Sequence, residues 1–103
     1  MAYKVRLSPR AILDLDSIYE QKNVLRSPSA ASWFLNLRDT ILSLESLPYR
    51  GTMAWDRPHL RQLLYGTKPH VFRILYSVDD GSSIVNIAQI RHGAMRPFNP
   101  PGP

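Results

Sequence analysis

The sequence predicts an α+β fold: an N-terminal strand, then a hairpin of two helices, then a three-strand antiparallel meander with both helices packed on one face of the sheet. Three observations support this expectation. Residues 3–7 alternate between apolar and polar side chains, two Ser-Pro pairs each introduce an amphipathic segment, and three strand-like segments follow in the last third of the chain. We assign residues 1–96 to one domain and residues 97–103 to a Pro-rich tail.

The first strand is expected over residues 3–7, where apolar side chains at every second position share one face. Directly after it, Ser8 is a good helix N-cap, and Pro9 suits the first helical turn, where its missing N–H leaves no hydrogen bond unmade. Apolar residues then recur at helical spacing, so a helix is expected over residues 9–22.

The same arrangement recurs at Ser27 and Pro28. Apolar residues follow at alternating spacings of four and three, which predicts an amphipathic helix over residues 28–46. The connection between the two helices, residues 23–27, is short and polar. It makes the helices antiparallel neighbours that can cover one face of a sheet.

Residues 49–58 contain Gly51 and Pro58 and show no clear period, so this segment is expected to be a surface loop. Trp55 within it is expected to close the end of the core, because buried aromatic area stabilises small domains. Turn residues separate the strand-like segments that follow, which predicts an antiparallel meander. Its strands are expected over residues 59–65, 70–78 and 83–91.

The middle strand of the meander places Phe72 and Tyr76 on one face, which is expected to pack against the helices, and Arg73 on the other. Arg61 and Arg91 on the neighbouring strands lie near Arg73 if the register allows. The three guanidinium groups would then converge on an open, cationic face of the sheet. The apolar residues of the last strand fit either face, so the register stays open.

Composition narrows the possible functions. Lys and Arg outnumber Asp and Glu by 13 to 8, which gives a formal net charge of +5, and most of the excess lies after residue 49. A basic surface favours an anionic partner such as nucleic acid, a nucleoprotein particle or an acidic protein. The absence of cysteine excludes disulfides and thiolate chemistry.

No segment approaches the roughly 20 apolar residues of a membrane span, and the N-terminus lacks the apolar region of a signal peptide. We therefore expect a cytoplasmic protein with no membrane partner. The three histidines lack the spacing of metal ligands, so neither a metal ion nor another cofactor is expected.

Five segments, taken in order, carry a family resemblance that covers nearly the whole chain. They are Val5-Arg6-Leu7-Ser8-Pro9-Arg10-Ala11 with Asp14-Leu15, Leu47-Pro48-Tyr49-Arg50-Gly51, Leu60-Arg61-Gln62-Leu63-Leu64, Phe72-Arg73-Ile74-Leu75-Tyr76 and Ile90-Arg91-His92-Gly93-Ala94-Met95-Arg96. With these segments the chain resembles the RelE/ParE superfamily of type II toxin–antitoxin toxins. The resemblance implies a small basic toxin that a cognate antitoxin holds inactive in a hetero-oligomer. ParE-like members bind DNA gyrase, whereas RelE-like members cut mRNA on the ribosome.

Catalytic residues are implied only if the chain is a ribonuclease. RNA cleavage through the 2′-hydroxyl needs a base, an acid and cations that stabilise the phosphorane charge. The resemblance matches Arg73 to a family arginine, and Arg91 or Arg96 to the arginine near the end of the chain. His92 can supply the acid–base chemistry. Alternatively, His92 is a turn residue that hydrogen-bonds the backbone.

The implied nuclease set is incomplete. Arg61 and Leu63 stand where the resemblance implies two lysines, and Phe98 stands where it implies a tyrosine. Arginine stays charged at physiological pH and is a poor proton donor or acceptor. We therefore favour a ParE-like inhibitor of DNA gyrase over a RelE-like ribosome-dependent mRNA endonuclease or a noncatalytic nucleic-acid-binding or inactive module. The target-binding residues of the ParE-like inhibitor are expected to be Arg61, Arg73, Arg91 and Arg96.

Partner contacts and structural alternatives can also be named. Leu13, Trp33 and Leu42 lie off the centres of the apolar stripes and are expected to form a groove for an antitoxin helix. Alternatively, they fill the seam between the helices. The last strand is expected to be a sheet edge that is open to strand addition by a partner. For Arg73, the structural alternative is an ion pair with Asp79 or Asp80, or packing of its aliphatic stem over apolar neighbours.

Overall fold

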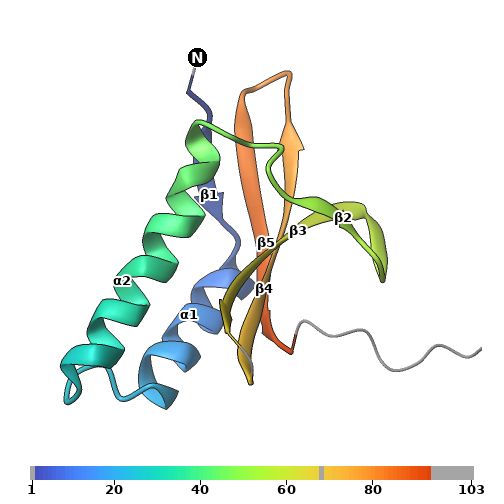
Figure 1. Cartoon of the computed structure of the whole chain (residues 1–103). Coiled ribbons are helices and arrows are strands. Elements are labelled where there is room, and N and C mark those ends of the chain that lie inside the picture. Colours follow the sequence, from blue (N-terminus) through green and yellow to red (C-terminus); the bar gives the residue numbers. More distant parts are fainter. Residues whose placement is uncertain (1, 68, 94–103) are drawn as a thin grey trace, which may run out of the picture.

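A five-stranded mixed sheet in the order β1-β5-β4-β3-β2 carries both helices on one face in the computed structural model of the chain (Figure 1). Residues 2–67 and 69–93 are described. The elements are β1 (Lys4–Leu7), α1 (Pro9–Gln21), α2 (Pro28–Leu42), a 3-10 turn (Ser43–Glu45), β2 (Thr52–Ala54), β3 (Arg57–Thr67), β4 (His70–Asp79) and β5 (Ile84–His92). β1 is parallel to β5, and the other neighbouring strands are antiparallel. The predicted α+β fold is confirmed.

Both helices begin where the two Ser-Pro pairs place them. The Ser8 hydroxyl accepts a hydrogen bond from the Ala11 N–H at 3.0 Å, and the Ser27 hydroxyl accepts one from the Ala30 N–H at 3.2 Å. Each cap satisfies a backbone donor that has no partner within its own helix. The second helix ends earlier than expected, at Leu42, and continues only as the 3-10 turn.

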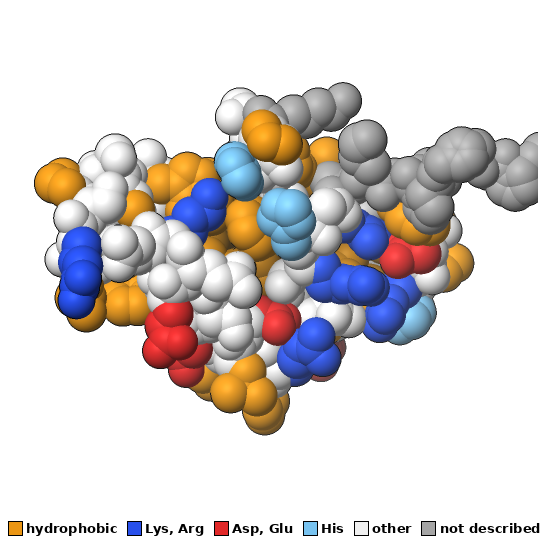
Figure 2. Space-filling view, turned by 90° about the horizontal axis from the view of Figure 1, so that it is seen from below, with side chains coloured by type: hydrophobic (Ala, Val, Ile, Leu, Met, Phe, Trp, Pro, Cys, Tyr) orange, Lys and Arg blue, Asp and Glu red, His pale blue; other side chains and the backbone are white. Residues whose placement is uncertain are grey.

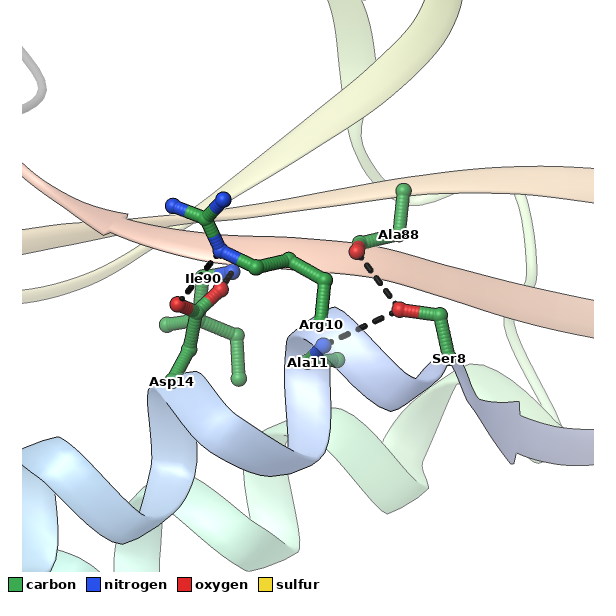
Figure 3. Close-up of polar contacts among 6 residues, drawn as sticks. All are labelled: Ser8, Arg10, Ala11, Asp14, Ala88 and Ile90. Carbon is green, nitrogen blue, oxygen red and sulfur yellow. Dashed lines mark hydrogen bonds and ion pairs between the residues drawn. The ribbon is translucent and has the colours of Figure 1, made fainter.

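Where β1 ends, α1 replaces it as the neighbour of β5 (Figure 3). The Ser8 hydroxyl donates to the Ala88 carbonyl at 2.7 Å, and the Asp14 carboxylate accepts from the Ile90 N–H at 2.9 Å. The other oxygen of Asp14 accepts from Nε of Arg10 at 2.9 Å. The side chains of the N-cap and first turns of α1 therefore satisfy strand groups that a longer β1 would have paired.

The main core lies between the helices and the sheet. Phe72 and Tyr76 of the middle strand are buried there, as predicted, together with Ile74 between them. The Tyr76 hydroxyl also accepts a hydrogen bond from the Gly51 N–H at 3.0 Å, which fixes the segment that leads into β2. The sheet is thus sealed by the helices on this face.

A β-bulge explains why the apolar residues of the last strand fitted either face. The register between β4 and β5 shifts at Ala88, which is left without a partner in β4. Val85 and Ile87 before the bulge and Ile90 after it are all buried in the main core. Ala88 packs on the opposite face against Leu75. One extra residue therefore reverses the alternation within the strand.

Two predictions about the sheet are wrong. Residues 49–58 are not simply a loop, because β2 forms within them and pairs with β3. A strand of three residues is too short to show a period of two. The last strand is not an edge, because β1 lies on its outer side, so the edges of the described sheet are β1 and β2. Residues 97–103 lie outside the described part of the chain.

The turn between β4 and β5 is tied to the rest of the domain by Asp80. Its carboxylate accepts hydrogen bonds from the hydroxyls of Tyr3, at 2.6 Å, and Tyr49. These two bonds lower the pKa of Asp80 and raise that of Tyr49 to about 12. Neither Asp80 nor Asp79 forms an ion pair with Arg73, whose carboxylate partner is Asp56.

Replacing Asp14 with alanine should destabilise the fold. Its carboxyl group is only 15% exposed, and its loss leaves the Ile90 N–H without its acceptor. We expect the free energy of unfolding to fall by about 1–3 kcal/mol in urea or thermal unfolding. Asp16→Ala, on the exposed side of the same helix, should change it by less than about 0.5 kcal/mol. Equal effects of the two substitutions would contradict the bridging role of Asp14.

Candidate functional site

The face of the sheet turned away from the helices holds a buried arginine. Arg73 of β4 is 3% exposed, and two of its guanidinium nitrogens donate to the two carboxylate oxygens of Asp56 at 2.5 and 3.1 Å. Nε and one Nη also donate to the side-chain oxygen of Gln62 at 3.0 and 2.9 Å. The indole ring of Trp55 lies 5.1 Å from the guanidinium carbon. We call Trp55, Asp56, Gln62 and Arg73 the Arg73 cluster.

The Arg73 cluster is a bidentate ion pair formed within the chain. Asp56 follows β2 and precedes β3, so the connection between these strands brings its carboxylate onto the open face. Hydrogen bonding to Arg73 lowers the pKa of Asp56, although desolvation opposes the shift. The carboxylate is therefore ionised at neutral pH, and it neutralises the charge of Arg73.

The three arginines predicted to converge do not. Arg61 of β3 is opposite Tyr76 in register, so its side chain lies on the helix-bearing face, with its guanidinium 4.7 Å from the ring of Tyr49. Arg91 of β5 is directly opposite Arg73, shares its face and is exposed. The prediction is wrong because the register of β3 turns Arg61 away. Arg96 lies outside the described residues.

Two of the three histidines, His70 and His92, come together at the end of the sheet. The rings of His70 and His92 are 6.3 Å apart, and His92 is 4.9 Å from the ring of Phe72. Figure 2 shows histidine side chains next to an apolar area of the surface. Because His92 is opposite Phe72 in register, the sheet separates it from Arg73 and Arg91.

Trp33 lies between α2 and the sheet, and not in the seam between the two helices that the alternative predicted. Its ring contacts those of Tyr65 and Phe72 at 5.1 and 5.5 Å, and the ammonium group of Lys22 lies 4.4 Å from it. The Tyr65 hydroxyl donates to the Trp33 carbonyl at 2.7 Å. Trp33 therefore joins the helices to the sheet.

An apolar groove of about 320 Å³ lies between β1 and the helices. Leu42 lines this groove, whereas Leu13, which is 63% exposed, is not among its lining residues. Because β1 is an edge of the described sheet, the groove runs beside a strand that can accept another. The lining residues are Val5, Leu7, Leu15, Phe34, Arg38, Ile41 and Leu42.

Over residues 2–67 and 69–93, no cluster of three or more His, Asp or Glu side chains is arranged to hold a metal ion. None of the helices described there has the length and apolar character needed to cross a membrane.

Sequence reasoning missed Asp56 and Gln62 as partners of Arg73. A usable signal was present, because Asp56 is the only acidic residue between Glu45 and Asp79. An arginine in the middle of an apolar strand needs a carboxylate or another acceptor when it is buried. The position of Asp56 in an apparent loop concealed this pairing.

Comparison with known proteins assigns the family. The sequence model described as the ParE toxin of the type II toxin–antitoxin system parDE matches residues 5–97. The chain belongs to this family of toxins. No curated protein is similar enough to the chain to count as a match.

Solved toxin structures share the fold. A chain of the RelBE2 toxin–antitoxin complex of Mycobacterium tuberculosis is 21% identical, with a TM-score of 0.64 over 90% of this chain and 100% of that one. A chain of the chromosomal ParDE system of P. aeruginosa is 20% identical, with a TM-score of 0.69 over 88% and 96%. Free E. coli RelE, as a double arginine-to-alanine mutant, is 16% identical, with a TM-score of 0.55 over 88% and 83%. These similarities show the fold and do not separate ParE-like from RelE-like activity.

Arg73→Ala should destabilise the domain, because it leaves the carboxylate of Asp56 without its cation. Asp56 is 22% exposed, so we expect a loss of about 2–4 kcal/mol, somewhat below the cost of breaking a fully buried pair. The exposed Arg91→Ala should change stability by less than about 0.5 kcal/mol. Equal unfolding free energies for the two variants in urea would contradict the structural role of Arg73.

The same pair makes stability depend on pH. The pKa of Asp56 is lowered in the folded state, so its stabilisation is present above the ordinary value of 3.8 and is lost as the pH falls through the folded value. Unfolding free energies measured between pH 7 and pH 3 should therefore fall less steeply in Asp56→Asn than in the wild type.

Proposed function

We propose that this chain is the toxin of a type II toxin–antitoxin pair and that it arrests growth by binding DNA gyrase, without cleaving nucleic acid. The observation that carries the proposal is the separation, by the sheet, of His92 from Arg73 and Arg91. Such a toxin acts in the cytoplasm, where gyrase and its DNA are found.

The open face is poorly suited to acid–base chemistry. A nuclease acting through the 2′-hydroxyl needs one group that accepts a proton and another that donates one. Arg73 keeps its charge and is already bound to Asp56. Asp56 has a lowered pKa and accepts two hydrogen bonds from Arg73, so it is a weak base. These features favour a surface that binds over one that catalyses.

The proposed target-binding residues contribute in different ways. Arg91 is exposed on the open face and can contact an anionic group of the target directly. Arg73 supports that face by holding the connection between β2 and β3 in place. Arg61 belongs to the opposite face, where it donates to the Gly51 carbonyl at 2.5 Å. Arg96 stays a proposal made from the sequence alone.

We further propose that the antitoxin occupies the apolar groove beside β1. The similar structures include toxin–antitoxin complexes, and the groove offers apolar area next to an edge strand. Lys4 and Arg6 are exposed on β1, and Arg38 lines the groove. An amphipathic segment with acidic residues would therefore match both its apolar floor and its basic rim. Strand addition is proposed at β1, since β5 is enclosed.

Expression of the chain alone should arrest growth, and a small protein encoded beside it should relieve the arrest. Induction of the SOS response and loss of supercoiling by purified gyrase would support the proposal. Codon-phased mRNA cuts on ribosomes, seen by primer extension, would instead identify a RelE-like endonuclease. The absence of both effects would indicate a noncatalytic nucleic-acid-binding or inactive module.

Arg91→Ala should reduce gyrase inhibition at least tenfold while antitoxin binding is retained, because an exposed contact is lost without unfolding.

Leu42→Glu should weaken antitoxin binding at least tenfold in a titration with the purified partner, because it places a charge in the apolar groove. Leu25→Glu is the matched control. Leu25 is 83% exposed in the connection between the helices, and its substitution should change the affinity by less than twofold. Leu13→Glu reports whether the antitoxin also covers the outer side of α1. Equal affinities for the Leu42 and Leu25 variants would place the antitoxin elsewhere.

A further inference from the structure

The Arg73 cluster has the geometry of an occupied anion site. Arg73 offers two parallel N–H groups to the two oxygens of Asp56, at 2.5 and 3.1 Å. The planar fork of a guanidinium binds a carboxylate and a phosphate in the same bidentate way. Gln62 engages Nε and one Nη from the side, so the edge facing Asp56 is the one that an external anion would use.

The surroundings of the Arg73 cluster would attract a phosphate if Asp56 carried no charge. Arg57 is close enough to Asp56 to help lower its pKa, and Arg91 is opposite Arg73 on the same face. Asp56 is the only acidic residue between Glu45 and Asp79. Three basic side chains therefore outnumber this one carboxylate, and removal of its charge makes the face more strongly cationic.

We propose that Asp56 is a specificity-determining residue: it fills the anion site of Arg73 and so prevents the open face from binding the phosphates of nucleic acid. The side chain of Asp56 is 22% exposed and that of Arg73 is 3% exposed, so a phosphate reaching this face meets the carboxylate first. The carboxylate of Asp56 excludes the phosphate in two ways: it occupies the guanidinium edge that the phosphate would bind, and its negative charge repels the phosphate. The face is thereby kept for a partner that does not need to bind phosphate at Arg73.

The inference goes beyond the proposed function, because it concerns the ligand that this face excludes. Its assay contains neither gyrase nor antitoxin. Failure of the assay would leave the proposed function untouched, and absence of gyrase inhibition would leave the inference untouched.

Asp56→Asn tests the inference directly, since asparagine keeps the size of the side chain and removes its charge. We expect the variant to bind a short single-stranded RNA at least tenfold more tightly than the wild type in fluorescence anisotropy at fixed salt concentration. The control is Asp16→Asn, which makes the same change in net charge at an exposed position of α1. It should change the affinity by less than twofold. Equal gains in both variants would overturn the inference, since net charge alone would then explain the binding.

A second measurement observes Arg73 itself, first in the wild type, where no substitution can disturb the fold, and then in Asp56→Asn. The Nε–Hε resonance of Arg73 is followed by NMR during titration with inorganic phosphate and then with the RNA. We expect no shift in the wild type with either probe. In Asp56→Asn, a shift with both probes supports a site for the phosphate group itself, and a shift with RNA alone supports a phosphodiester site. A wild-type shift of Arg73 with either probe would overturn the inference.

Discussion

The fold depends on satisfying both edges of β5, the strand next to the short parallel strand β1. β1 pairs only as far as the contact between Leu7 and Ile87, and the backbone groups of β5 beyond that point still need partners. Ser8, the N-cap of α1, and Asp14 within α1 supply them. Helix and sheet are therefore joined by hydrogen bonds as well as by apolar packing. Ser8 and Asp14 belong to the first of the five segments that carry the family resemblance, and this structural role explains that segment.

Burial of Arg73 places a second constraint on the molecule. A guanidinium that is 3% exposed needs several acceptors. The connection between β2 and β3 provides Asp56, and β3 itself provides Gln62. The short strand β2 therefore helps to position Asp56. The consequence for function is that Arg73, the cation at the centre of the sheet, is already bound to a carboxylate of the same chain.

The sequence predicted the local features well. Ser8 and Ser27 mark the helix starts because capping depends on neighbouring residues, and the faces of β4 follow from simple alternation. Features set by distant contacts were not predictable. The bulge at Ala88 reverses the faces of β5, and the register of β3 turns Arg61 to the helix side. Neither leaves a periodic signal, because one extra residue or one shifted pair is enough to change the outcome.

The sheet divides the proposed sites between its two faces. The groove lies on the helix side of β1, whereas Arg91 lies on the open face. An antitoxin segment confined to the groove would leave Arg91 uncovered. To block the proposed target-binding face, the antitoxin must extend past the β1 edge or exclude the target by its bulk. The edge strand is suited to the first route, because a chain paired with β1 lies at the border between the two faces. Neutralisation of the toxin would then depend on the backbone of β1 as much as on the apolar groove.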